Sequence, residues 1–287
     1  MEQNFLTPGQ ITKSVVETGI KKVRIPARDQ LILGLLAGAF IAFAAEGSNM
    51  AAFNLFADSE TYGLGKVLAG SIFGTGLMLV LLAGGELFTG NSLIIISVLE
   101  KKVRLRSMLS NWVVVYIGNF IGSILIAYMI VQSGLLGSGG NMLGATTIKI
   151  AAYKVGLPFL SAFYLGVMCN WLVCLAVWIA YSAKDITGKI LGIFFPIWLF
   201  ITSGFEHSVA NMYYIPAGIL AKADATLAEA THLSSETLAG LNWQTFIINN
   251  LIPVTLGNII GGGFFVAVLY WLVYLKGNHQ NDGEKRL

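Results

Sequence analysis

The chain has 287 residues, of which 55% are hydrophobic and only 11% charged, and its net charge is +3. A soluble domain carries about 25% charged residues, so most of this surface must face something other than water. The small net charge gives no indication of nucleic-acid binding. The two cysteines, Cys169 and Cys174, lie inside an apolar stretch without the spacing of metal ligands. We therefore expect a membrane protein, and the sequence indicates no metal site and no cofactor.

The N-terminal segment, residues 1–28, is polar and charged. Thr7 can cap a helix, Pro8 suits its first position, and Gln10 lies three residues after the cap. Apolar residues then recur at helical spacing, which predicts an amphipathic helix. Two interpretations stay open for it: an interfacial helix along the inner leaflet of the membrane, and a gate over a cytoplasmic opening.

Six apolar stretches follow, each at least as long as a bilayer crossing, about 20 residues. They occupy roughly residues 30–50, 66–98, 110–132, 159–181, 190–220 and 245–275. We divide the chain into the helix of residues 1–28, a six-span transmembrane domain of residues 29–276, and a tail of residues 277–287.

The lysines and arginines are unequally distributed between the two sides of this arrangement. Fourteen lie in the N-terminal segment, the loops after the second and fourth spans, and the C-terminal tail. The other side holds Lys66, Lys149, Lys154 and Lys222. Positive residues favour the inner side, so both termini are predicted to be cytoplasmic in a multi-pass protein of the cell inner membrane.

The two halves of the transmembrane domain, about 29–133 and 158–276, share sequence patterns. The pattern N-x6-G-N-x2-G begins at Asn111 in the third span and at Asn250 in the sixth. Each half has three spans, so the second half is inverted relative to the first. The predicted fold is an all-α membrane protein with six transmembrane helices in an inverted 3+3 repeat. We attribute the glycines of the pattern to close packing of helices.

Two spans contain a run of glycine and polar residues at mid-depth. The second carries Gly84–Asn91 and the fifth carries Ser203–Asn211. Non-helical backbone at that depth is tolerated only where it is buried in protein or lines a cavity. We therefore expect both helices to be broken, with free N–H groups at the half-helix N-termini that favour an anion.

The breaks carry the candidate functional side chains. His207 is the only histidine within a span, and its unperturbed pKa of about 6.5 suits proton exchange; the alternative is a buried structural histidine. Thr89, in the other break, can hydrogen-bond His207 or a passing ion. Lys154 lies just outside the fourth span. It can either extend to the lipid headgroups or raise the local anion concentration.

Each break also holds a glutamate five residues before an asparagine, in the pairs Glu86 with Asn91 and Glu206 with Asn211. A carboxylate facing the passage would repel an anion, so we interpret these polar residues as structural ties to loop amides or helix ends. A proton relay is the alternative for the glutamates.

Apolar residues flank the breaks and are candidates for constrictions, although plain core packing is the alternative. From the residues alone these are Phe73, Leu77, Leu87 and Phe200.

Four stretches of the sequence resemble the formate/nitrite transporter family. They are Gly-Glu-Leu-Phe-Thr-Gly-Asn (85–91), Cys-Asn-Trp-Leu-Val-Cys-Leu-Ala (169–176), Gly-Phe-Glu-His-Ser-Val-Ala-Asn-Met (204–212) and Pro-Val-Thr-Leu-Gly-Asn-Ile-Ile-Gly-Gly (253–262). The resemblance extends over about residues 5–276. It implies an aquaporin-like fold and a homopentamer with one pore in each protomer.

The resemblance also implies roles for individual residues. Thr89 and His207 would form a central polar pair between two hydrophobic slits, near the motif asparagine Asn170, and Lys154 would be the lysine of the outer vestibule. The slit residues would be Phe73, Leu77, Leu87, Val173 and Phe200, and we also predict a constriction at Phe88, beside Leu87 on the loop of the second-span break.

The implied activity is transport of small monovalent anions of weak acids through the lipid bilayer, most of all formate. Nitrite and hydrosulfide are the alternative substrates, because the loop Phe-Thr-Gly-Asn looks closer to those branches, while residues 211–218 look similar to formate channels. Short carboxylates can share the pore. In the expected mechanism Lys154 draws the anion inward and His207, aided by Thr89, shares a proton with it.

Two alternatives of other classes have little support. An intramembrane enzyme would need paired catalytic groups or a metal cluster, but the sequence has no HExxH motif and no second histidine within a span. An aquaporin-type channel for neutral solutes would carry paired Asn-Pro-Ala motifs, and the sequence has none. We expect no catalytic residue.

Overall fold

The computed structural model describes residues 4–276, so the predicted tail of residues 277–287 lies outside the described residues. Helices make up nearly all of the described part, in which the one β contact is an isolated bridge between Phe5 and Ala183. The first half comprises α1 (Pro8–Arg24), α2 (Ala27–Ala52), α3 (Tyr62–Met78), α4 (Phe88–Asn91), α5 (Ile95–Leu99) and α6 (Leu105–Gln132). The second half comprises α7 (Met142–Val155), α8 (Phe159–Ser182), α9 (Ile186–Thr202), α10 (Ser208–Ala221), α11 (Ala225–Glu229), α12 (Ser235–Gly240), α13 (Trp243–Thr245), α14 (Ile252–Ile259) and α15 (Leu269–Trp271).

Several of these helices are joined by stretches of other helical type. A π-helical stretch, Leu79–Gly84, prolongs α3, and short 3-10 turns occupy Leu55–Ala57, Ser92–Ile94 and Leu135–Gly137. The last helix alternates α segments with π-helical stretches at Phe246–Leu251, Ile260–Val268 and Leu272–Lys276. No sequence signal predicted these π segments.

Five helices of the described residues are long and apolar enough to cross a membrane: Ala27–Ala52, Tyr62–Gly84, Leu105–Gln132, Phe159–Ser182 and Trp243–Lys276. They match the first, third, fourth and sixth predicted spans, and the second as far as Gly84, where that span is interrupted before Phe88–Leu99. The remaining span, the fifth, is divided into α9 and α10, which are each too short by themselves. The prediction of an all-α membrane protein is confirmed.

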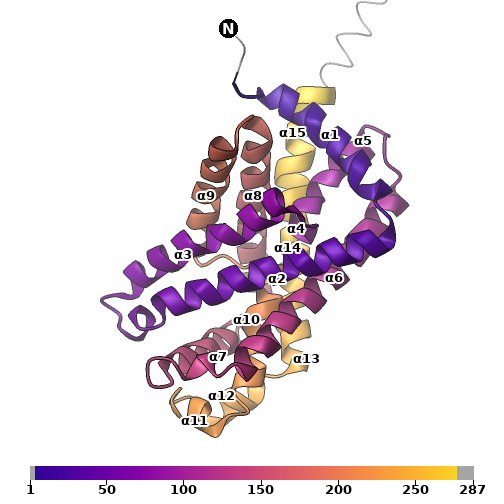
Figure 1. Ribbon diagram of the computed structural model, residues 1–287. Coiled ribbons are helices and arrows are strands. Elements are labelled where there is room, and N and C mark those ends of the chain that lie inside the picture. The colour runs from indigo at the N-terminus through magenta and orange to yellow at the C-terminus, as the bar shows by residue number, and fades with distance from the viewer. Residues whose placement is uncertain (1–3, 277–287) are drawn as a thin grey trace, which may run out of the picture.

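Helix α1 lies across one end of the bundle, beside the end of the last helix (Figure 1). The backbone N–H of Thr7 donates to Gln10 Oε1 at 2.8 Å, which caps the start of α1. Ile11 and Val15 are buried on its inner side. The segment before α1 is joined to the end of α8, because the Leu6 N–H donates to the Ser182 carbonyl at 2.9 Å.

The long helices pack closely at glycines, in the same way in both halves. A Cβ at Gly122 of α6 would collide with the carbonyl oxygen of Leu35 in α2, and a Cβ at Gly261 would collide with that of Val167 in α8. The backbones can approach so closely only because these residues have no side chain. The pair α2 with α6 in the first half therefore has a counterpart in the second half, α8 with the last helix.

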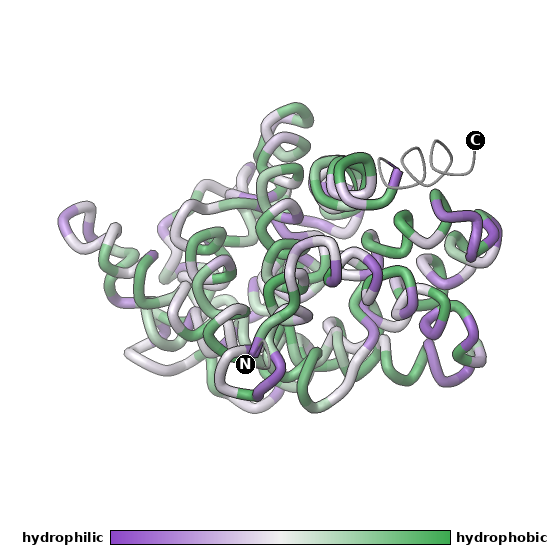
Figure 2. The backbone as a smooth tube through the Cα atoms, turned by 90° about the horizontal axis from the view of Figure 1, so that it is seen from above, coloured by the Kyte–Doolittle hydropathy of each residue, from purple (hydrophilic) through white to green (hydrophobic). Residues whose placement is uncertain are grey.

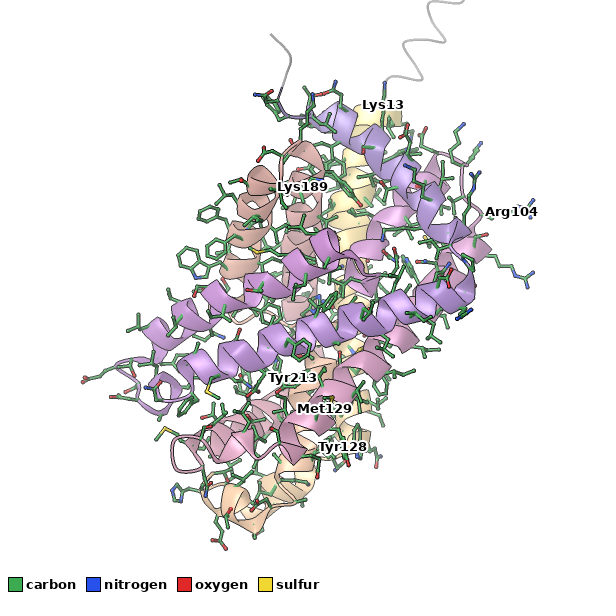
Figure 3. All side chains as sticks on the ribbon, viewed as in Figure 1. Lys13, Arg104, Tyr128, Met129, Lys189 and Tyr213 are labelled. Carbon is green, nitrogen blue, oxygen red and sulfur yellow. The ribbon has the colours of Figure 1, made fainter. Side chains whose placement is uncertain are left out.

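Hydrophobic and hydrophilic residues occupy different parts of the bundle. Hydrophobic residues colour most of the helical stretches in Figure 2, and hydrophilic residues gather in connecting segments. In Figure 3 the labelled Lys13, Lys189 and Arg104 lie toward the end of the bundle that carries α1, and Tyr128 and Met129 lie toward the other end. Basic residues from three separate segments thus share one end of the molecule.

Candidate functional site

Both predicted interruptions are present, and each begins at a glycine in a left-handed backbone conformation. Gly84 has φ +102° where the second span stops, and Gly204 has φ +76° after α9. Residues with side chains rarely adopt this region. The chain then runs extended through Leu87 and His207, which are the N-cap residues of α4 and α10. Each broken span therefore presents a helix N-terminus to the interior of the protein.

The first break is held by Asn119 of α6. Its side-chain amide donates to the carbonyls of Gly34 and Glu86, each at 2.8 Å, and its Oδ1 accepts from the backbone N–H of Phe88 at 2.9 Å. One buried side chain thus satisfies backbone groups that the interrupted helix leaves without partners, which would be costly at membrane depth.

Asn258 of α14 holds the second break by the same contacts. It donates to the carbonyls of Gly166 at 2.8 Å and Glu206 at 3.0 Å, and accepts from the N–H of Ser208 at 2.9 Å. Sequence reasoning had attributed the shared pattern to glycine packing alone and missed this role of its second asparagine. The recurrence of that asparagine in both halves was the available signal.

The carboxylate of Glu86 is buried, and both of its oxygens accept a hydrogen bond. Oε2 accepts from the Asn91 side chain at 2.8 Å, and Oε1 accepts from Lys22 Nζ at 2.7 Å. Asn91 also donates to Asn111 Oδ1 at 2.9 Å. The carboxylate therefore connects α1, through Lys22, to the break of the second span.

Glu206 makes the matching contacts in the second half. Its Oε2 accepts from Asn211 at 2.7 Å and from Asn250 at 3.1 Å, and its Oε1 accepts from Lys154 Nζ at 2.6 Å. The Lys154 ammonium also lies 5.2 Å from the centre of the Tyr214 ring. The positive charge of Lys154 is thus matched by a buried negative charge.

These ion pairs show that the repeat is longer than the sequence patterns indicated. Lys22 on α1 and Lys154 on α7 occupy equivalent places, and the N-cap residues Pro26 of α2 and Pro158 of α8 follow them. The helices α1 and α7 therefore correspond, although both lie outside the two half-repeats defined from sequence. Sequence reasoning missed Lys22, although Lys22 precedes Pro26 by the same number of residues as Lys154 precedes Pro158.

Thr89 and His207 meet between the two breaks. Thr89 Oγ1 lies 2.9 Å from His207 Nε2, and both residues are buried. His207 Nδ1 accepts from the backbone N–H of Ala210 at 3.1 Å, so Nδ1 has no proton and Nε2 has one in the neutral ring. Nε2 therefore donates to Thr89, and the hydroxyl hydrogen of Thr89 remains free to donate to a further acceptor.

Asn170 of α8 supports this pair. Its side-chain amide donates to the carbonyls of Thr89 at 3.1 Å and Asn258 at 2.7 Å. It is fully buried. Asn170 thereby links the loop that carries Thr89 to the helix that holds the second break.

One candidate constriction residue, Phe200, lies beside His207, and a second, Phe73, packs against Phe200. The rings of Phe73 and Phe200 meet edge to face with their centres 5.6 Å apart, and the Phe200 ring centre lies 6.0 Å from that of His207. Leu77, Leu87 and Val173 are buried in the same core. The contact of Phe200 with His207 gives the polar pair an apolar neighbour in this core.

Phe88 is not brought to this group. Its ring lies 4.8 Å from that of Tyr116 and 5.8 Å from that of Trp112, centre to centre, in edge-to-face contacts. It lines an apolar groove between α6 and the last helix. Its neighbours Leu87 and Thr89 are the loop residues that belong to the site.

A cavity of about 870 Å³ reaches the site from one side of the protein. Its lining includes Lys154, Glu206, His207, Phe200 and Tyr214. His207 is therefore accessible to a small solute that enters this cavity, whereas Thr89 is fully buried and does not line it.

One ionisable residue within a span, Glu46, was missed. Glu46 of α2 is buried, and its carboxylate accepts a hydrogen bond from the Tyr213 hydroxyl of α10, a residue labelled in Figure 3. A carboxylate inside the first apolar stretch was a sufficient signal, because such residues are costly in a membrane. This contact joins the first span to the broken fifth span.

Comparison with known proteins gives consistent matches. The model of the formate/nitrite transporter family matches residues 9–272. A probable formate transporter of Methanothermobacter thermautotrophicus is 40% identical over 96% of this chain and 100% of its own. The formate channel FocA of Escherichia coli strain K12 is 34% identical over 96% of each chain. A solved pentameric formate channel with formate bound superposes with a TM-score of 0.77 at 40% identity, covering 87% of this chain and 98% of its own.

Proposed function

We propose that this chain, which belongs to the formate/nitrite transporter family, conducts small monovalent anions of weak acids, and formate in particular. Membership of a transporter family confirms that the protein is a membrane transporter and not an enzyme, and it sets aside the aquaporin-type alternative. Formate is favoured because two relatives, at 40% and 34% identity, are described as a probable formate transporter and a formate channel. Nitrite, hydrosulfide and short carboxylates remain alternative or additional substrates.

The observation that carries the proposal is the contact of Thr89 with His207 between two broken helices. An anion that enters an apolar passage loses its hydration, and an unpaired charge there is costly, whereas a neutral acid is less so. A group that gives the anion a proton at this point would lower the barrier. Thr89 can receive the anion, because its hydroxyl hydrogen is free to donate.

The geometry also defines what proton transfer requires of His207. In the neutral ring Nδ1 accepts from the N–H of Ala210, at the N-terminus of α10. A second proton can bind only at Nδ1 and must displace this contact. We propose that a proton binds transiently at Nδ1 and that the ring then passes the proton on Nε2 to the anion held at Thr89. This transfer leaves a neutral ring with its proton on Nδ1. The starting tautomer returns when Nδ1 releases that proton to water, Nε2 takes one up, and Nδ1 again accepts from the Ala210 N–H. The acid then crosses the second apolar slit and releases the proton beyond it.

We propose a structural role for Lys154 within this scheme. It was expected to draw the anion inward, but its ion pair with Glu206 carries no net charge. Its contact supports the break that presents His207. The pair Lys22–Glu86 would do the same for the break that presents Thr89.

The protein is proposed to act as a homopentamer with one pore in each protomer. The similar solved formate channel is described as pentameric. Large apolar side chains are exposed on α6 and α9, among them Val113, Ile117, Phe195 and Leu199. Such faces suit contact with lipid or with neighbouring protomers.

We further propose that the protein lies in the cell inner membrane with both termini in the cytoplasm. The shared end of Lys13, Arg104 and Lys189 supports this orientation (Figure 3). Helix α1 would then lie at the inner leaflet, and the cavity that reaches His207 would open to the outside.

The experiment that tests the proposal measures flux into liposomes that contain the purified protein. Formate, nitrite and hydrosulfide are compared at several pH values, with protein-free liposomes as the control. We expect formate to enter fastest and its rate to rise as the pH falls. Faster flux of nitrite or hydrosulfide would reassign the substrate, and flux of all three at the level of protein-free liposomes would contradict a channel for these anions.

A further inference from the structure

The family resemblance assigns the positive charge of the cavity that leads to His207 to Lys154, but other lysines of the cavity carry the net positive charge. The lysines that line the cavity are Lys66, Lys149 and Lys154, and Glu206 is the carboxylate among the described lining residues. Lys154 and Glu206 neutralise each other at 2.6 Å. Two lysines therefore supply the remaining positive charge, and they differ in setting.

Lys66 is the half-buried one. It lies in the first turns of α3, and within the described part of the chain it has neither a hydrogen bond nor an ion pair, whereas Lys149 is exposed. An ammonium withdrawn from water without a partner is costly. Lys66 lines the cavity, so an anion in the cavity is the partner that would offset this cost.

Two polar side chains on the cavity wall also have unused hydrogen-bonding atoms. Asn49 of α2 is only 2% exposed, and its Nδ2 has no hydrogen-bond partner among the described residues. The buried Oγ1 of Thr202, at the end of α9, likewise has no hydrogen-bond partner among the described residues. Both residues line the cavity with Lys66. An amide N–H and a hydroxyl are donors that a carboxylate or other oxyanion can accept from.

Helix packing brings these groups to one region of the cavity. The Ser48 hydroxyl, next to Asn49, donates to the Ala69 carbonyl of α3 at 2.8 Å. Thr202 Oγ1 would lie 2.9 Å from a Cβ at Gly70, which is four residues after Lys66 and on the same side of α3. On the other wall, a Cβ at Gly204 would lie 3.7 Å from Lys66 Nζ. The turns of α2, α3 and α9 that carry the three donors are therefore neighbours.

We infer that Lys66, Asn49 Nδ2 and Thr202 Oγ1 form a docking subsite at which a small carboxylate or oxyanion binds in the cavity before it reaches His207. The inference rests on the proposed function, because the anion that docks is the one that the channel conducts. The ammonium supplies the attraction, and the two neutral donors orient the anion's oxygens. The subsite concentrates the substrate ahead of the apolar rings of Phe73 and Phe200.

The test compares Lys66→Met with Lys149→Met in liposomes that contain the full-length protein. Both variants remove one lysine charge from the same cavity, and Met retains most of the apolar length of Lys. For Lys66→Met we expect the half-saturating formate concentration to rise about tenfold, with little change in the maximal rate. We expect Lys149→Met to change it less than about twofold, because an exposed charge is screened by solvent and salt. Lys66→Arg should restore the half-saturating concentration.

A second measurement does not depend on transport. The purified protein is treated briefly with acetic anhydride in formate or in gluconate of equal ionic strength, and acetylation of each lysine is measured by mass spectrometry. Formate should slow the modification of Lys66 severalfold and leave that of Lys149 unchanged.

The outcomes separate the subsite from the channel proposal. Equal half-saturation in Lys66→Met and Lys149→Met, or equal acetylation of Lys66 in the two salts, would overturn the subsite and leave formate transport by the unmodified protein intact. Absence of formate flux in the unmodified protein would contradict the channel, and protection of Lys66 by formate in that protein would still establish the subsite.

Discussion

At the residue scale, His207 serves two functions that depend on different ring nitrogens. Nδ1 caps α10 by accepting from the Ala210 N–H, and Nε2 contacts Thr89 at 2.9 Å. The cap fixes the tautomer, and the tautomer determines which atom of Thr89 is free. The N-terminus of α10 thus determines where the protons of both His207 and Thr89 lie.

We predict that Thr89→Val is far more harmful than Thr89→Ser. Valine keeps the shape of threonine but leaves the buried Nε2–H of His207 without an acceptor, at a cost of about 1–3 kcal/mol. Formate flux and the thermal unfolding midpoint should both fall in the valine variant. The serine variant, which keeps the hydroxyl, should resemble the unmodified protein. Similar flux and midpoints in the two variants would show that the hydroxyl has no role.

The sequence indicated some of these residues and not others, for a physical reason. Thr89, His207, Glu86 and Glu206 stand out because polar groups inside an apolar span are costly and rarely accidental. Lys66 lies at the start of an apolar stretch, where a lysine is ordinary, and its lack of a partner is visible only after folding. The contacts of Lys154 likewise depend on Glu206, 52 positions away in the chain.

At the element scale, two ion pairs attach short helices to the broken spans. Lys22 joins α1 to the first break, and Lys154 joins α7 to the second. The side chains of the Lys154–Glu206 pair are 12% and 2% exposed, against 21% and 6% for Lys22–Glu86. The second break therefore depends on the more deeply buried pair.

We predict that Lys154→Met lowers the thermal unfolding midpoint more than Lys22→Met does. Loss of either lysine leaves a buried carboxylate uncompensated, which costs about 3–5 kcal/mol in a well-buried pair and less in a more exposed one. Thermal unfolding of the detergent-solubilised protein measures the difference. The double variant Lys154→Met with Glu206→Gln should recover part of the lost thermal unfolding midpoint. If its midpoint does not exceed that of Lys154→Met, the unpaired carboxylate is not the cause of the loss.

Helix packing gives a prediction of its own. Gly122→Ala places a methyl group against the Leu35 carbonyl of α2, so we expect α2 and α6 to separate and the protein to lose about 1–3 kcal/mol of stability. Gly63→Ala is the matched control, since a Cβ there meets no atom within 4 Å. Equal thermal unfolding midpoints in the two variants would contradict close packing at Gly122.

Elements were predicted well where hydropathy alone determines them. The apolar stretches located the spans, and the glycine and polar runs located both breaks. The π-helical stretches of the last helix were not foreseen, because periodicity does not distinguish them from α-helix. The correspondence of α1 with α7 was also missed, since their sequences share only the lysine and proline spacing.

At the scale of the whole molecule, the bundle is polarised along its length. Helix α1 and the end of the last helix share one end, and α11 and α12 lie at the other (Figure 1). The charge bias in the sequence is sufficient to predict this polarity. It could not predict the cavity or the subsite within it, because these depend on how α2, α3 and α9 pack.

Cysteine labelling tests the orientation. We expect Lys13→Cys and Arg104→Cys to react with a membrane-impermeant maleimide only from the cytoplasmic side of vesicles, and Glu236→Cys, on α12, only from the other. Cys169 and Cys174 are buried, so the unmodified chain should give little background. Labelling of Lys13→Cys and Glu236→Cys from the same side would refute the arrangement.

The most direct test of the central claim is formate uptake by His207→Asn in liposomes, measured beside the unmodified protein between acidic and neutral pH. Asparagine can still accept from the Ala210 N–H as an N-cap, so the variant should fold, but it cannot carry a proton. We predict that uptake by the unmodified protein rises as the pH falls, and that the rate of uptake by the variant is lower by about 100-fold or more. Full retention of formate uptake by His207→Asn, with the same pH dependence, would contradict the account.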